Sequence, residues 1–317
     1  MKISILCCRA LSFCALPSLL AGCGGSQPPL GAPGAMPLQS AQSSRQYEHT
    51  SPLLYVTNFS ADYNDVKIYH ANAKDPNPLA IITNDIDTPA DGCLDAQGTL
   101  YVTNEPVNGV GWISEYPAGK TKAAKVITKG IDLPGFCGID GKGNLWVTNV
   151  AGPDVTEYLA GSTKPHTAIT KGMVYPVGIA IDHEGNIYVS NRPSEDSGNV
   201  EVYPPGGKSP TRTITEGVSS PVGITVDANG ILYVTNINEN TVEEYRFGKS
   251  QPYREITKAM DQPCAVTVNK NGYLYVTNYA NNVVVEFAPG STTPSNRQIS
   301  KGLYTPEGTA YYPPLLP

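Results

Sequence analysis

The sequence has few of the residues on which nucleic-acid binding and the commoner enzyme chemistries depend. Its 317 residues include 22 Lys and Arg against 28 Asp and Glu, with four His and two Trp, and contain no run of Lys or Arg. Because binding to a phosphate backbone needs clustered positive charge, we expect no nucleic-acid partner. The Gly-x-Ser-x-Gly, His-Glu-x-x-His and Walker patterns are also missing, so no catalytic motif identifies an enzyme class.

Apolar residues do not recur at helical spacing over three turns within residues 51–312, so we expect almost no helix there. The sequence instead repeats a short signature, Tyr-Val-Thr-Asn or a close variant. The six copies begin at Tyr55, Tyr101, Trp146, Tyr188, Tyr233 and Tyr275. Intervals of 42 to 46 residues between copies indicate one supersecondary unit that is used repeatedly.

Each signature lies in a longer frame of four short β-branched and aromatic runs, separated by Gly, Asn, Asp and Pro. In the fourth copy, the first run begins at Pro176, an Asp-x-x-Gly turn follows at Asp182, and the second run begins at Tyr188. This pattern is typical of strands joined by tight turns. Four strands per unit at this period predict an all-β fold, a six-bladed β-propeller of four-stranded antiparallel blades.

The order of the runs predicts how the ring closes. We name the strands of a blade a to d, with strand a beginning at the Pro and strand b carrying the signature. The chain enters the propeller at a strand b (54–58) and leaves it at a strand a (306–311). Blade one would lack its inner strand unless the last run supplied it, so we predict a 3+1 closure. The propeller then spans residues 51–312 and is followed by a tail, 313–317.

The N-terminal segment does not belong to the repeat. Its apolar run, Ala10 to Leu20, has 11 residues, which is too short to span a bilayer. The sequence Leu-Ala-Gly-Cys at 20–23 resembles a bacterial lipobox, which implies a signal peptide (1–22) and acylation of Cys23; an ordinary secretory signal is the alternative. By the same resemblance, Gly24 in place of Asp implies the outer membrane. Residues 24–50 are rich in Gly, Pro, Gln, Ser and Ala and should act as a disordered tether.

Three cysteines align with strand a and should lie buried near the axis: Cys93, Cys137 and Cys264. Their spacing matches no zinc pattern. The default interpretation is that they act as small buried hydrophobes. A disulfide between Cys93 and Cys137 is the alternative, provided that neighbouring inner strands bring the two Cα atoms within about 7 Å.

The frame Pro-x-Gly-Ile-x-Val-Asp-x-x-Gly-x-Leu-Tyr-Val-Thr-Asn resembles the NHL and YVTN families of bacterial propellers, in the TolB-like and SMP-30-like neighbourhood. The resemblance covers nearly all of residues 51–312. It implies the architecture but not the activity, because these families include extracytoplasmic binding proteins, lactonases of the SMP-30/gluconolactonase type and streptogramin lyases.

An enzyme of these families would be expected to carry His or a divalent metal at the mouth of the central channel. The four His are predicted to lie elsewhere: His49 in the tether, His70 after a strand c, His166 before a strand d and His183 in an a–b turn. A calcium site would need inward carboxylates, for which Asp91 and Glu307 are weak candidates. The signature Asn residues should cap the turn after strand b. We therefore expect no cofactor.

Residues that break the repeat indicate a recognition surface. In a propeller the b–c and d–a loops share one face, here named the bc face, and the a–b and c–d loops share the other, the ab face. The predicted binding residues on the bc face are Phe59, Tyr63, Trp112, Tyr175, Arg192, Tyr279, Tyr304 and Glu307. Aromatic residues on loops are enriched where partners bind, although packing at the rim is the alternative.

The sequence thus predicts a lipid-anchored protein of the bacterial envelope. We expect a monomeric propeller that binds a protein or a glycan through its bc face and is held to the membrane by its lipid. A metal-dependent lactonase or lyase is the alternative function.

Overall fold

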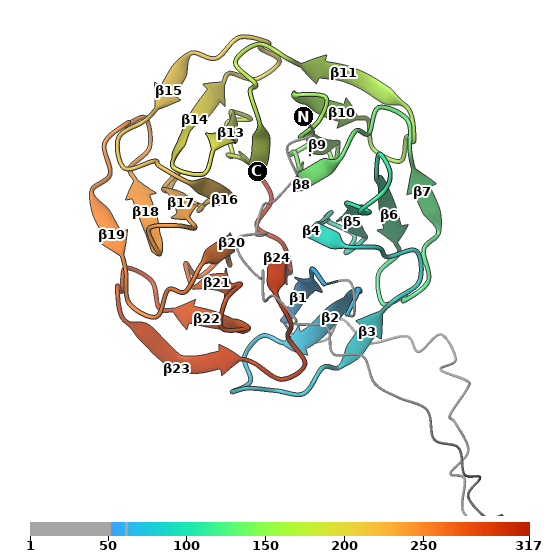
Figure 1. The fold of residues 1–317 in the computed structure, drawn as a ribbon, viewed down its shortest axis with the longest axis vertical. Coiled ribbons are helices and arrows are strands. Elements are labelled where there is room, and N and C mark those ends of the chain that lie inside the picture. The colour runs from blue at the N-terminus through green and yellow to red at the C-terminus, as the bar shows by residue number, and fades with distance from the viewer. Residues whose placement is uncertain (1–51, 61–62) are drawn as a thin grey trace, which may run out of the picture.

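The computed structural model describes residues 52–60 and 63–317, which form a ring of six β-sheets around a central axis (Figure 1). Every sheet has four antiparallel strands, in the order a to d from the axis outward. Within these residues there is no helix, and hence none that could cross a membrane. The predicted six-bladed fold is confirmed. The predicted signal peptide, Cys23 and the tether lie outside the described residues.

The strands of each class occupy equivalent places in the six blades. Strands a are β24 (Pro306–Tyr312), β4 (Pro89–Leu94), β8 (Pro134–Ile139), β12 (Pro176–Ile181), β16 (Pro221–Val226) and β20 (Pro263–Val268). Strands b are β1 (Leu53–Asn58), β5 (Leu100–Asn104), β9 (Leu145–Asn149), β13 (Ile187–Ser194), β17 (Leu232–Asn236) and β21 (Leu274–Asn278). Strands c are β2 (Asp65–His70), β6 (Trp112–Tyr116), β10 (Asp154–Tyr158), β14 (Ser197–Tyr203), β18 (Thr241–Tyr245) and β22 (Val283–Phe287). Strands d are β3 (Ala80–Ile82), β7 (Lys125–Ile127), β11 (Pro165–Ile169), β15 (Arg212–Ile214), β19 (Arg254–Ile256) and β23 (Pro294–Ile299).

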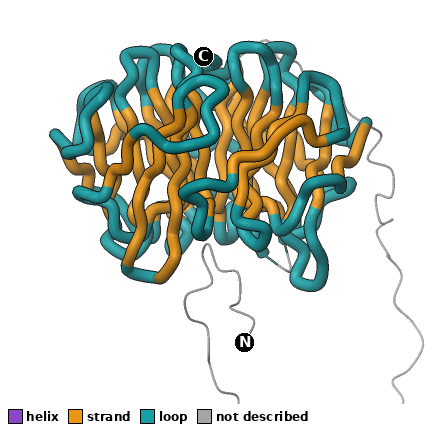
Figure 2. Tube along the Cα trace, turned by 90° about the horizontal axis from the view of Figure 1, so that it is seen from above, coloured by secondary structure: helices purple, strands orange, loops and turns teal. Residues whose placement is uncertain are grey.

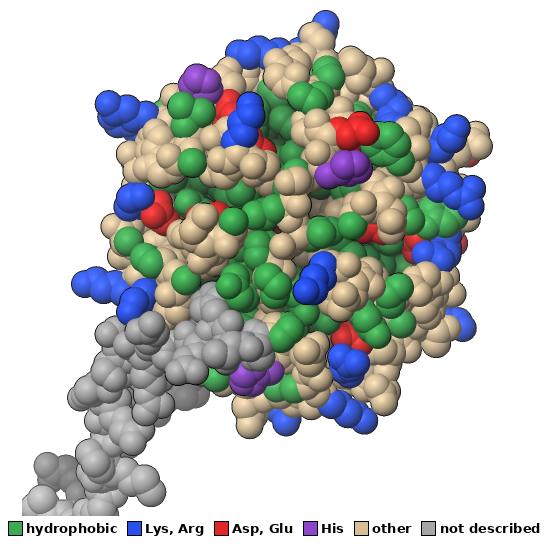
Figure 3. Space-filling model, turned by 180° about the vertical axis from the view of Figure 1, so that it is seen from behind, with side chains coloured by type: hydrophobic (Ala, Val, Ile, Leu, Met, Phe, Trp, Pro, Cys, Tyr) green, Lys and Arg blue, Asp and Glu red, His purple; other side chains and the backbone are tan. Residues whose placement is uncertain are grey.

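The ring closes as predicted, because the last strand completes the first blade. β24 pairs antiparallel with β1, and Tyr55 lies opposite Ala310. After β24 the chain continues over the ab face, which is uppermost in Figure 2. There Leu315 and Leu316 pack against apolar side chains of the inner strands. Figure 3 shows hydrophobic side chains gathered over the centre of this face.

The aromatic and aliphatic residues of the repeat form the core between the sheets. The Val of the signature is fully buried in all six blades, and the signature Tyr or Trp is at most 7% exposed. The aromatic residue near the end of strand c is also buried, and in the five blades where it is Tyr its hydroxyl donates a hydrogen bond to the d–a connector that leads into its blade. Tyr158 bonds to the carbonyl of Lys129 at 2.6 Å and Tyr245 to that of Glu216 at 2.7 Å. These residues therefore have a structural role within the blade and do not indicate a ligand site.

The signature Thr, which is Ser190 in blade four, joins five of the six blades to the next. In blade five, Thr235 Oγ1 accepts a hydrogen bond from the N–H of Gly223 (2.9 Å) and donates one to the carbonyl of Cys264 in blade six (2.7 Å). Donation to the following inner strand recurs in blades one, three, four and six. The strands approach so closely that a Cβ atom on Gly223 would lie 2.5 Å from the Cys264 carbonyl oxygen. This close approach explains the Gly of the Pro-x-Gly sequence.

The signature Asn is structural and bridges the turn after strand b, as expected, because Asn236 Nδ2 donates to Thr241 Oγ1 (3.2 Å) at the start of strand c. It also has partners that we did not expect. Asn236 Oδ1 accepts the N–H of Ser219 (3.1 Å), and its Nδ2 donates to the carbonyl of Gly217 (2.8 Å). These two partners lie in the d–a connector before strand a. The Asn of every other blade likewise accepts an N–H from its own connector. Each Asn therefore fixes the loop that enters its blade on the bc face.

The Asp-x-x-Gly turns of the ab face have the predicted chemistry. Asp182 Oδ1 accepts the N–H groups of Glu184 (3.0 Å) and Asn186 (2.9 Å). Gly185 has a φ of +83°, a conformation that residues with a Cβ rarely adopt. The Asp residues at this position are accordingly committed to the hairpin.

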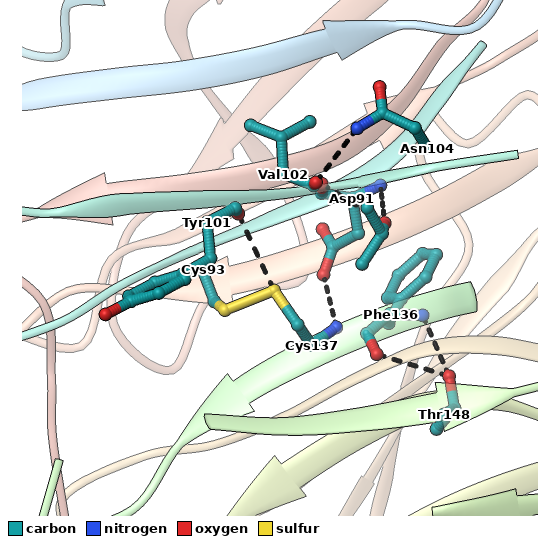
Figure 4. Close-up of a disulfide and its surroundings, with 9 residues drawn as sticks. Asp91, Cys93, Tyr101, Val102, Asn104, Phe136, Cys137 and Thr148 are labelled. Carbon is teal, nitrogen blue, oxygen red and sulfur yellow. Dashed lines mark hydrogen bonds between the residues drawn. A yellow bond between two sulfur atoms is a disulfide. The ribbon is translucent and has the colours of Figure 1, made fainter. Parts of the chain in front are cut away.

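Cys93 and Cys137 form a disulfide between the neighbouring inner strands β4 and β8 (Figure 4). Their Cα atoms are 5.8 Å apart. The default interpretation of these two residues as small hydrophobes is therefore wrong, because the inner strands converge at the axis closely enough for a bridge. Cys264 is fully buried on β20.

Candidate functional site

The mouth of the central channel on the bc face is built in the same way by all six blades. The residue after each signature Asn donates its backbone N–H to the carbonyl of the residue before strand a, at 2.9 to 3.1 Å. This contact holds one side chain per blade around the entrance. We name this set the mouth ring; it consists of Phe59, Glu105, Val150, Arg192, Ile237 and Tyr279. The backbone is constant around the ring while the side chains differ. Arg192 and Tyr279 are its partly exposed members, and the other four are buried.

The side of the mouth formed by blades three to six is largely apolar. Tyr175 and Tyr279, two of the predicted site residues, pack as half-buried side chains against one cluster, which includes Val177, Val222 and Ile237. Arg192, also predicted, bonds through its N–H to the carbonyl of Tyr175 at 2.9 Å. The structure therefore brings these three residues to the mouth itself.

The opposite side of the mouth carries carboxylates. Asp91 and Glu307 lie on the adjacent inner strands β4 and β24, and a Cβ on Gly308 would collide with the backbone of Asp91. Asp91 Oδ2 accepts the N–H of Cys137 at 3.3 Å (Figure 4). Burial raises the pKa of Asp91 to about 8, in spite of this and other backbone hydrogen bonds that act in the opposite direction.

The metal prediction concerns these same two carboxylates. Across residues 52–60 and 63–317, no three side chains of His, Cys, Asp or Glu are grouped closely enough to hold a metal ion. The assignment of Asp91 and Glu307 as metal ligands stays a prediction.

The predicted residues of blade one form a separate aromatic group beside the mouth. The rings of Tyr63 and Tyr304 are stacked, with centroids 3.8 Å apart and planes at 6°, although the two residues are 45% and 42% exposed. Phe59 is tied to the same connector, because its N–H donates to the carbonyl of Thr305 and its own carbonyl accepts the Thr305 hydroxyl. Phe59 itself is only 6% exposed, so Tyr63 and Tyr304, from loops near opposite ends of the propeller sequence, form the exposed aromatic surface.

Trp112 lies farther from the axis than the mouth ring. It is the first residue of β6, a strand c, and neighbouring strands are about 4.8 Å apart, so roughly 10 Å separates it from β4. Its indole Nε1 donates to the carbonyl of Asp85 (3.3 Å) and to Ser114 Oγ (3.1 Å). The ring is half-buried on the outer part of the bc face.

The central channel below the mouth is narrow. Asp91, Cys93, Tyr311 and Leu316 are among the residues that line its cavity of about 130 Å³. On the ab face, the structure groups residues that the sequence placed in separate turns. His166 and His183 border one cleft between blades three and four. His166, predicted to lie before strand d, lies within that strand, β11. The grouping could have been foreseen, because the start of a strand d and the next a–b turn lie on the same face.

No protein-family model matches the chain, and no curated protein matches its sequence. Among solved structures, a chain in the crystal structure of a nidogen/laminin complex is similar to it, with a TM-score of 0.65 and 15% identity. That similarity covers 82% of this chain and 98% of the other. A protein of unknown function from Bacteroides caccae is similar with a TM-score of 0.65 and 12% identity, over 83% and 99% of the two chains. At such identities the likeness shows the fold alone, and it supports the β-propeller.

Proposed function

We propose that this chain is a non-enzymatic binding or scaffolding module that recognises a protein ligand through its bc face. The observation that carries the proposal is the aromatic surface of blade one beside a mouth ring that does not repeat. Repeated positions are explained by the blade, as shown by the signature Val, Thr and Asn. The exposed Tyr63–Tyr304 stack has no such role in the repeat.

The chemistry of the bc face suits a protein surface. Tyr and Trp supply large contact areas at a low cost in conformational entropy and are enriched among residues that dominate binding. Arg192 is partly exposed at the mouth, where its charge would help to fix the orientation of a partner, whereas Glu307 is fully buried and does not reach the surface. The chain of similar fold in the nidogen/laminin complex is an example of a propeller that takes part in a protein complex. A glycan that stacks on the tyrosines is the other ligand we consider.

We further propose that the propeller belongs to the NHL/YVTN type and works as a monomer at the bacterial envelope. The lipobox-like sequence at 20–23 supports acylation of Cys23 and an outer-membrane location. Cys23→Ser should move the protein from the membrane fraction to the soluble fraction, because acyl chains would be its anchor. Unchanged membrane association of that variant would overturn the anchor.

One observation favours the alternative, a metal-dependent lactonase or lyase. A carboxyl whose pKa is raised towards neutrality, like that of Asp91, can serve as a general acid or base. Hydrolysis of simple lactones by the purified domain, lost in Asp91→Asn, would support the enzyme.

The binding proposal is tested by capture from a detergent-solubilised envelope extract on the immobilised domain. Tyr304→Ala and Trp112→Ala should each weaken capture by about 2 kcal/mol or more if the residue is an anchor of the interface. Phe247→Ala is the matched control, since Phe247 is equally exposed (44%) but lies in a c–d loop of the ab face. Thermal unfolding should change little in all three variants. Full capture by both bc-face variants, or a large loss of stability with capture intact, would overturn the proposal.

A further inference from the structure

A second candidate site lies on the ab face, away from the residues of the proposed function. It is the cleft between blades three and four, with a volume of about 560 Å³. Small-molecule sites commonly have volumes of roughly 300–1,000 Å³ and combine an apolar lining with a few polar groups. The cleft opens on the face shown in Figure 3.

Apolar side chains supply the walls of this cleft. Trp146, Ile169 and Ile187 are buried, while Leu159 beside them is 44% exposed. Trp146 occupies the signature position that is Tyr in the other five blades. Its Nε1 donates to Asp140 Oδ2 at 3.2 Å, which holds the indole in place. The walls can therefore accept a hydrocarbon chain or a ring.

The acidic groups deep in the cleft already have hydrogen-bond donors. The Asp140 carboxylate accepts the N–H groups of Lys142 (2.8 Å) and Asn144 (2.9 Å), in addition to the Asn144 side chain (3.0 Å) and Trp146. Glu157 Oε1 accepts the same Asn144 side chain at 3.0 Å. These neutral donors hold both carboxylates in place at the base of the cleft.

Blade three lacks the ion pair that covers this place in other blades. Glu157 corresponds to Glu115, Glu244 and Glu286, the residues before the last aromatic of strand c. Those three form ion pairs with Lys125, Arg254 and Arg297 of strand d. In blade three the facing segment of β11 carries Pro165 and His166 instead. Histidine is shorter than the lysine or arginine of the other blades and is a weaker base, so the cleft beside Glu157 stays open.

Basic groups predominate at the rim. Lys142, Lys208, His166 and His183 are exposed there, against Glu184 as the acidic residue. The Lys208 ammonium donates to Thr167 Oγ1, which holds it across the gap between the two blades. Lysine is charged throughout the physiological range, and histidine gains charge as the pH falls.

We propose that this cleft binds a small amphipathic organic anion. Its apolar body would lie against Trp146 and Leu159, and its carboxylate, sulfonate or phosphate group would face Lys142 and Lys208. Burial raises the pKa of Glu157, so this carboxyl loses its negative charge at a higher pH than an ordinary glutamate does.

Octanoate is the probe for the test, with octylamine and 1-octanol as the cationic and neutral controls. The chain has two Trp residues, so Trp112→Phe leaves Trp146 as the sole tryptophan and its fluorescence as a local reporter. Octanoate should give a saturable change in this fluorescence. Octanol should bind more weakly and octylamine more weakly still.

Substitution of the two lysines at the rim tests whether the cleft binds the anionic group. In the same background, Lys142→Gln with Lys208→Gln should weaken octanoate binding roughly threefold to tenfold, which corresponds to two partly exposed charge contacts. Lys249→Gln with Lys270→Gln is the matched control, because these exposed lysines occupy a c–d loop and an a–b turn of blades five and six. The control should bind like its parent. The proposal is overturned if octanoate gives no saturable change, if octanol or octylamine binds as well, or if both lysine pairs weaken binding equally.

Discussion

The bridging role of the signature Thr gives a prediction that isolates a single oxygen atom. Thr235 is fully buried, and its Oγ1 is bonded to the Gly223 N–H of its own blade and to the Cys264 carbonyl of the next. Thr235→Val has nearly the same shape but no hydroxyl. It leaves a buried donor and a buried acceptor without these partners, at the point where two inner strands are in contact.

The expected loss follows from the cost of an unmade hydrogen bond. A buried donor or acceptor without a partner costs about 1–3 kcal/mol, so Thr235→Val should lower the free energy of unfolding by about 2–3 kcal/mol. In a domain of this size that corresponds to a fall in Tm of roughly 4–10 °C. Urea unfolding followed by circular dichroism measures the first quantity, and calorimetry measures the second.

Thr235→Ser provides the control that the protein itself suggests. In blade four the equivalent residue is Ser190, whose Oγ accepts the Gly178 N–H at 2.8 Å and donates to the Val222 carbonyl at 2.7 Å. The Ser variant should therefore lose only the packing of one methyl group, about 0.8 kcal/mol. Equal losses in the Val and Ser variants would refute the reasoning, because the methyl group and not the oxygen would then matter.

Three further predictions concern the ring and its channel. Deleting the residues after Gly302 removes β24 and should abolish cooperative unfolding; a truncated protein as stable as its parent would contradict the closure. Replacing Cys93 and Cys137 together by Ala should cost roughly 4 kcal/mol of unfolding free energy, because the bridge closes a loop of 44 residues. Urea unfolding with the two proteins side by side measures this loss, and equal midpoints would count against it. The pKa of Asp91, about 8 in the folded protein, lies above its unfolded value of roughly 3.9, so the folded state holds a proton that the unfolded chain releases and stability should fall as the pH rises between these values. The difference in unfolding free energy between Asp91→Asn and the parent should therefore shift in favour of the variant from pH 5.5 to pH 8. The same difference at both pH values would rule this out.

The sequence was sufficient for the architecture because the repeat encodes it. The spacing of the signatures predicted the blades, and the position of the last strand a predicted the pairing of Tyr55 with the C-terminal strand. The connector partners of the signature Asn were not predictable in the same way. Its side chain reaches the connector about 17 residues earlier, and a pattern shows which positions recur but not which loop faces them.

Some of the candidate functional residues could likewise be predicted from the repeat, whereas others depend on the three-dimensional arrangement of the strands and blades. Phe59, Arg192 and Tyr279 could be found because each follows a signature Asn and each differs from blade to blade. The distance of Trp112 from the axis depends on which strand carries it, and the cleft at His166 and His183 depends on the angle between two blades. The angle between the two blades is not visible in the sequence. The loss of one strand-d cation is visible only when Glu157 is compared with its counterparts in the other blades.

The convergence of the inner strands connects these observations to function. The same closeness requires Gly223, allows Thr235 to reach the next blade and brings the Cα atoms of Cys93 and Cys137 to 5.8 Å. It also limits the channel to a cavity of about 130 Å³, with Leu315 and Leu316 among its lining residues on the ab face. That volume is below the roughly 300–1,000 Å³ of common small-molecule sites. Recognition of a protein by this propeller is therefore expected on its two faces, where the loops differ.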